Sequence, residues 1–195
     1  MRLAESASTS RQDGFTIVEV LVALLIITVM ALGTAQLFAV SIRATQAARY
    51  QTSTTVLASQ KLEQLRSLTW GFDEAGTGLP VSDTTTNLGQ DPPTGNGSGL
   101  NPSPPGTLNQ NIAGYVDYLD ARGRWVGTGV TPPATATYIR RWSIEPLPTN
   151  PNNTLILQVL VTTVKRQSEL AGTPGPRRRM ADDALIVSVK TRKAR

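Results

Sequence analysis

Few residues of this chain could carry out chemistry. Its 195 residues include no cysteine and no histidine, which excludes thiolate nucleophiles, disulfides, histidine-ligated metals and the serine–histidine–aspartate triad. One carboxylate pair, Asp117 and Asp120, is a candidate for a hydrolase. Its i, i+3 spacing places the two side chains on opposite faces of a strand, so they do not converge. We therefore expect no enzyme, no cofactor and no metal site.

One further carboxylate lies where a charge is costly. Glu19 comes directly before the 23 residues from Val20 to Ile42, none of which is charged. As a helix this run would span about 35 Å, enough to cross the ~30 Å hydrocarbon core of a bilayer. A carboxylate costs on the order of 3 kcal/mol at the bilayer centre and less near the interface. Glu19 either has a cationic partner or lies at the interface, where the start of a helix favours a negative charge.

The residues around Glu19 form a dense motif. The segment GFTIVEVLVAL, residues 14–24, closely resembles the N-terminal signal of type IV pilins and pseudopilins. The resemblance implies that a prepilin peptidase cuts between Gly14 and Phe15, that Phe15 becomes N-methylated, and that Glu19 guides assembly. Residues 1–14 would then be the leader. A secretory signal peptide is the competing interpretation, but its apolar stretch would be shorter, about 7–15 residues.

The resemblance also implies a physical task for Glu19. A cut before Phe15 exposes an α-amine, which is largely cationic at neutral pH. An incoming subunit could present this amine to the Glu19 carboxylate of its neighbour. In a bundle of low dielectric the pair attracts, and either charge left alone is costly. The pair would therefore set the axial register between packed helices.

The helical pattern continues over residues 43–70. One helix face is expected to be apolar, and its members are Leu57, Ala58, Leu62, Leu65, Leu68 and Thr69. Lys61 is expected mostly off this stripe, and the run of hydroxyl residues at 52–55 favours fraying or a bend. We predict one helical spine with a membrane half, residues 15–42, and an amphipathic half that packs against a head.

The remaining chain falls into a loop and a sheet. Residues 71–110 hold eight glycines and six prolines, which predicts a long surface loop. Residues 111–195 contain strand patterns, beginning with a hairpin-like pair at 115–119 and 124–126. Three apolar segments follow, at 136–145, 154–164 and 184–191. The sequence thus predicts an α+β fold, a long helix on a three- to five-stranded antiparallel sheet.

Two details of the head are also predicted. Leu185, Val187 and Val189 alternate and would share one face of the last strand. Arg140 and Arg141 lie beside Trp142, which allows a cation–π site, although packing at the edge of the sheet is favoured.

The order of strands in the head resembles that of the PilV type of minor pilin and of the GspI type of pseudopilin. The long insertion before the sheet favours the pilus type over the compact pseudopilin of type II secretion. The resemblance implies a single-pass inner-membrane precursor with a periplasmic head, and later a place in the pilus fibre or at its tip. The implied partners are prepilin peptidase, other pilin subunits, the inner-membrane assembly platform and the lipid bilayer.

The positive charge is concentrated at the C-terminal end. Residues 165–195 carry nine Lys/Arg and three Asp/Glu, whereas the rest of the chain has a net charge of −1. The run Arg177, Arg178 and Arg179 is the candidate basic contact patch, and a membrane-tethered DNA-uptake subunit is the third functional hypothesis. Nucleic acid is the less favoured partner because no aromatic residue for base stacking lies within ten positions. A solvated, basic chain end is the preferred interpretation.

Overall fold

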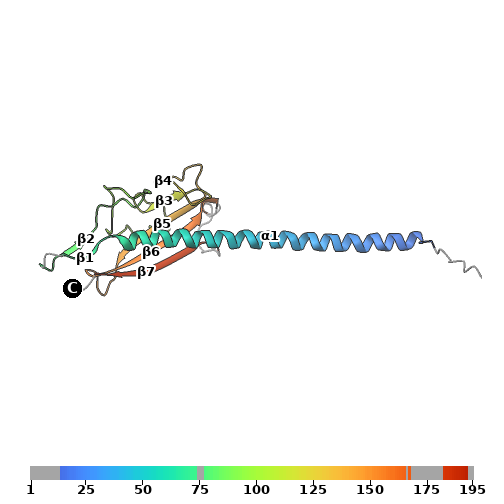
Figure 1. The fold of residues 1–195 in the computed structure, drawn as a ribbon, viewed down its shortest axis with the longest axis horizontal. Coiled ribbons are helices and arrows are strands. Elements are labelled where there is room, and N and C mark those ends of the chain that lie inside the picture. Colours follow the sequence, from blue (N-terminus) through green and yellow to red (C-terminus); the bar gives the residue numbers. More distant parts are fainter. Residues whose placement is uncertain (1–13, 74–76, 166, 168–181, 193–195) are drawn as a thin grey trace, which may run out of the picture. The chain divides into compact units, whose positions relative to one another are not determined.

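The computed structural model describes residues 14–73, 77–165, 167 and 182–192. The long helix α1 (Ile17–Ser67) is followed by strands along the chain (Figure 1). The strands are β1 (Trp70–Phe72), β2 (Pro80–Ser82), β3 (Val116–Leu119), β4 (Trp125–Thr128), β5 (Tyr138–Pro146), β6 (Thr154–Thr163) and β7 (Ala184–Thr191). The chain divides into two compact units, Met1–Thr45 and Gln46–Arg195. The expected α+β, pilin-like architecture is confirmed.

The second half of α1 packs through one stripe. Its buried residues are Thr54, Leu57, Ala58, Lys61, Leu62 and Leu65, which follow the i, i+3, i+4 spacing of a helix face. The expected stripe is confirmed except at its end, since Thr69 is exposed and lies beyond α1. The expected interruption at 52–55 is wrong. Hydroxyls there bond to the preceding turn, as Thr55 Oγ1 does to the Gln51 carbonyl at 2.8 Å, so α1 continues.

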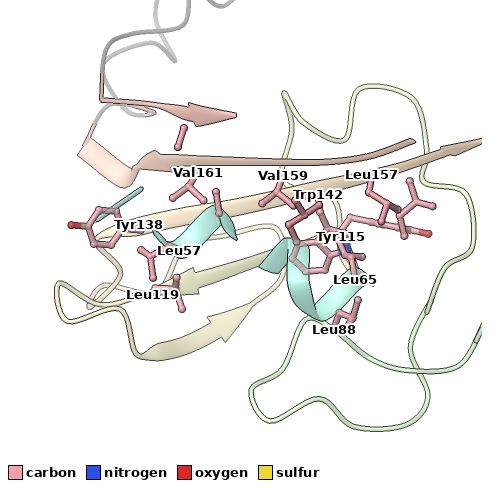
Figure 2. Packing of buried hydrophobic residues seen from close by; sticks show 14 of the residues in the cluster. Leu57, Leu65, Leu88, Tyr115, Leu119, Tyr138, Trp142, Leu157, Val159 and Val161 are labelled. Atoms are coloured by element: carbon pink, nitrogen blue, oxygen red, sulfur yellow. The ribbon is translucent and has the colours of Figure 1, made fainter. Parts of the chain in front are cut away.

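Five strands form one antiparallel sheet in the order β4-β3-β5-β6-β7. The hairpin-like pattern is confirmed as β3 paired with β4. The face of β5 that carries Tyr138, Trp142 and Ile144 belongs to the main core, together with Leu57 and Leu65 of α1 (Figure 2). Because β5 lies in the middle of the sheet, the expectation that its arginines and Trp142 pack at a sheet edge is wrong.

The opposite face of the sheet has a smaller cluster of its own, built on Val116, Tyr118 and Ile139. At the β7 edge this face is open. Val187 and Val189 share a face as predicted, but they are 53% and 57% exposed. The residues of β7 that reach the main core are instead Ala184 and Ile186. The predicted alternation along β7 is therefore confirmed, and the side that faces the main core is the one opposite Val187 and Val189.

The described residues of the glycine- and proline-rich segment, 71–73 and 77–110, pack against the head and do not form only a surface loop. The segment contains β2 and the end of β1, which pair with each other, and it buries Leu88 and Leu100. Its backbone is also held by the sheet, because Trp125 Nε1 donates a hydrogen bond to the Gly89 carbonyl at 2.8 Å. The segment is therefore a packed part of the head.

A test of this packing uses two glycines of the same segment. A Cβ at Gly97 would lie 2.1 Å from Asn87 Cα, whereas a Cβ at Gly95 meets nothing within 4 Å. Gly97→Ala should therefore lower the free energy of unfolding by about 1–3 kcal/mol through overpacking, and Gly95→Ala should leave it nearly unchanged. Thermal unfolding of the two variants measures the difference. Equal melting temperatures would show that the segment does not pack as described.

Candidate processing and assembly site

The peptide bond between Gly14 and Phe15 lies just outside the helix. Residues 14–16 are not helical, and α1 begins at Ile17. Phe15 is 82% exposed, and apart from the two neighbours of Gly14 in the chain nothing lies within 4 Å of where its Cβ would be. An exposed, non-helical bond of this kind is accessible to a peptidase.

Thr16 starts the helix. Its carbonyl accepts a hydrogen bond from the Val20 amide at 3.2 Å, and its Oγ1 accepts one from the Glu19 amide at 3.3 Å. Thr16 is thus the N-cap, and Glu19 occupies the third helical position, the spacing of a capping box. The sequence carries this signal as Thr-x-x-Glu, which our sequence analysis did not use. A cut after Gly14 leaves both residues in the mature chain.

Glu19 begins α1 with an exposed carboxylate. Within the described residues it has no ion-pair partner, and the positive end of the helix dipole favours its negative charge. Every described residue from Gly14 to Thr52 is exposed, including the apolar ones, and by length and composition α1 could cross a membrane. The exposed apolar side chains can be buried by lipid or by other helices, and the Glu19 carboxylate can pair with a cation from outside the chain.

A buried ion cluster, formed by Lys61, Asp117 and Arg140, lies in the head. Lys61 Nζ is 2.8 Å from Asp117 Oδ2, and Arg140 holds both oxygens of the same carboxylate at 2.9 and 2.8 Å. Asp117 and Lys61 are fully buried, and Arg140 is 2% exposed. The two cations also donate to main-chain carbonyls, Lys61 to Leu88 at 2.6 Å and Arg140 to Leu57 at 3.3 Å.

This cluster corrects two expectations from the sequence. Lys61 does not lie off the buried stripe of α1. Its ammonium, 4.4 Å from the ring centroid of Trp142, forms the cation–π contact that the sequence allowed only for Arg140 or Arg141. A signal was present, because Lys61 lies four residues from both Leu57 and Leu65, two members of the stripe. Its charge made a solvent-facing position the default interpretation.

The electrostatics of the cluster favour a structural role. Burial, reinforced by Arg140 and opposed by Asp117, lowers the pKa of Lys61 from 10.5 to about 8. Asp117 is fully engaged by two cations, and Asp120 lies in the β3–β4 turn, where its Oδ1 accepts the amides of Arg122 and Arg124 at 2.8 and 2.9 Å. The two carboxylates do not meet, so this arrangement offers no acid–base pair.

The basic end of the chain is only partly described. Arg177, Arg178 and Arg179 lie outside the described residues. The expectation that this end is merely solvated is wrong for two of its members. Lys190 Nζ donates to the Arg66 carbonyl in the last turn of α1, and Arg192 bonds to several main-chain carbonyls.

Comparison with known families then adds an independent observation. Residues 9–35 match the prokaryotic N-terminal methylation motif. Nothing among curated proteins or solved structures matches the chain. The methylation motif supports a type IV pilin-like or pseudopilin-like precursor. It implies processing by a prepilin peptidase and assembly with other pilins, and proteins that carry it are usually structural rather than enzymatic.

The ion cluster makes a prediction about stability. Asp117→Asn would leave two buried cations without their shared counter-ion and should cost about 3–5 kcal/mol. Lys61→Met leaves the bidentate Arg140–Asp117 pair intact and should cost less or be neutral. Denaturant titration of both variants measures these changes. An Asp117→Asn variant as stable as the wild type would rule out a paired buried carboxylate.

The lowered pKa of Lys61 also predicts a pH dependence. Because the folded pKa of about 8 lies below the unfolded value of 10.5, folding disfavours the charged amine. The resulting penalty is fully present below pH 8 and is relieved as pH rises toward 10.5. The unfolding free energy of the wild type relative to Lys61→Met should therefore increase between these two pH values. Parallel curves for the two proteins would contradict the shift.

Proposed function

We propose that this chain is the precursor of a minor type IV pilin. It would insert through residues 15–42 with the leader in the cytoplasm and the head in the periplasm. Prepilin peptidase would cut between Gly14 and Phe15, and Phe15 would become N-methylated. The observation that carries the proposal is the placement of an exposed, non-helical Gly14–Phe15 bond directly before a capped helix whose first turn holds Glu19.

Assembly would then use the unsatisfied groups of α1. The apolar side chains up to Ile42 are exposed, so they need lipid before assembly and neighbouring helices afterwards. Glu19 would receive the new α-amine of an adjacent subunit, since a charge pair that leaves water is stable only when both partners are present. The cap at Thr16 would hold the first turn, so that the carboxylate has a fixed position relative to that amine.

A minor pseudopilin of a type II secretion system would use the same processing and the same helix. We favour the pilus because the described residues of the 71–110 segment pack into the head, with Leu88 and Leu100 buried and the Leu88 carbonyl bonded to Lys61. Such an insertion suits a subunit with an elaborated surface. Deleting the gene and scoring pili against secreted enzymes separates the two roles. A secretion defect with normal pili would reject the pilus assignment.

Cleavage is tested by mass spectrometry of the mature chain. We expect an N-terminal N-methylphenylalanine corresponding to Phe15 in the wild type. Gly14→Val should leave the full-length chain in the membrane, because a side chain at the scissile position blocks the peptidase. Gly95→Val is the matched control, since that glycine is also open, and it should be processed normally. A mature N-terminus at Met1 or beyond Val20 would reject the proposed processing.

The role of Glu19 is tested separately from cleavage. Glu19→Val should still be cut and methylated, but its incorporation into sheared fibres should fall about tenfold or more, the factor that corresponds to about 1.4 kcal/mol. Glu63→Val is the control, because Glu63 is an exposed glutamate of the same helix paired to Arg66 at 3.0 Å. Immunoblotting of fibre and membrane fractions measures both. Equal incorporation of the two variants would exclude Glu19 from assembly.

A further inference from the structure

Three segments that are far apart in the sequence meet at one end of the head. They are the β1–β2 hairpin, the turn at residues 150–153 and Arg192, which directly follows β7 (Figure 1). The chain has no cysteine, so no disulfide can join them. Their connection depends on non-covalent contacts.

The side chain of Arg192 reaches two of these segments at once. Its Nε donates to the Asn152 carbonyl at 2.8 Å, and its Nη1 donates to the carbonyls of Gly71 at 2.9 Å and Val81 at 3.1 Å. Its Nη2 lies 3.1 Å from Ser82 Oγ. The guanidinium therefore binds both strands of the hairpin and the turn.

An aromatic ring completes the arrangement. The guanidinium carbon of Arg192 lies 3.6 Å from the ring centroid of Trp70, which is a stacking distance. Trp70 Nε1 in turn donates to the Asn153 carbonyl at 3.2 Å, and the Arg192 amide donates to the same carbonyl at 2.8 Å. Arg192 makes no ion pair within the described residues, so neutral carbonyls and a ring hold its charge.

The hairpin depends on such an anchor. Its strands contain three residues each, and an isolated two-stranded hairpin is marginal in water. Trp70 of β1 packs against the main core, but on the β2 side Leu79 and Val81 are 63% and 40% exposed. Burial of apolar surface therefore contributes little to holding β2. Only an arginine provides a planar fork that can stack on a ring and donate to several acceptors at once.

We propose that Arg192 is a non-covalent clamp that closes the head by joining the β1–β2 hairpin, the 150–153 turn and the end of β7. It joins the C-terminal end of the sheet to the segment that follows α1 without a covalent link. Releasing it should free the hairpin locally while the central strands stay folded, because β5 and β6 belong to the main core. This clamp does not rest on the processing proposed above.

Hydrogen exchange on the full chain in detergent micelles tests the clamp, with Arg192→Lys as the variant. A lysine keeps the charge but loses the fork and the stacking. Exchange in β1, β2 and the end of β7 should accelerate about tenfold or more, the size expected when a hydrogen bond to a charged group is lost. Exchange in β5 and β6 should not change. Arg124→Lys, at an exposed arginine in the β3–β4 turn, is the matched control and should match the wild type.

Ser82→Ala is a milder variant that removes one acceptor and keeps the chain folded. It should accelerate exchange in the hairpin by a smaller factor. The clamp is rejected if Arg192→Lys exchanges like the wild type. It is also rejected if exchange rises equally in every strand, because Arg192 would then support the whole head and not this junction.

Discussion

The head depends on one buried carboxylate. Asp117 of β3 is shared by Lys61 of α1 and Arg140 of β5, and through Lys61 it also holds the Leu88 carbonyl. Helix, sheet and the glycine-rich segment therefore meet at one charge. Sliding α1 by one turn, about 5.4 Å, would separate Lys61 from Asp117 and leave buried charges without a partner or water. The cluster thus specifies a single register, which apolar contacts alone would specify less sharply.

The ion cluster holds only the second part of α1, so the two parts of the helix have different surroundings. Its buried stripe begins only at Thr54, whereas every described residue up to Thr52 is exposed. Residues 20–42 of the first part carry no charge and expose their apolar side chains, which favours lipid or other helices as their surroundings. The second part packs on the sheet. The ion cluster fixes the second part from within the chain. In the first part Glu19 is exposed and has no ion pair within the described residues. Under the proposed function its partner would come from a neighbouring subunit, so the register between subunits would be set between chains.

Elements with a regular period could be predicted from the sequence, whereas contacts between elements could not. The apolar stripe of α1, the β3–β4 hairpin and the interior strand β6 follow from spacing alone. The burial of Leu88 and Leu100 has no local period, since it arises from the Trp125–Gly89 hydrogen bond and from the close approach of Gly97 to Asn87. Lys61 was misplaced because a lysine on a helix is exposed unless a distant carboxylate, here Asp117, compensates its charge.

The distribution of charge acquires a different meaning once these contacts are known. The net positive charge lies in the C-terminal residues, because residues 165–195 carry nine Lys/Arg against three Asp/Glu. This excess favoured an interpretation as a solvated or anion-binding tail. Lys190 instead donates to the Arg66 carbonyl, one of the carbonyls that the end of a helix leaves free. Arg192 binds the carbonyls beyond that end. A chain without disulfides can therefore use cations as main-chain donors, and its net charge of +5 overstates the charge free to attract a partner.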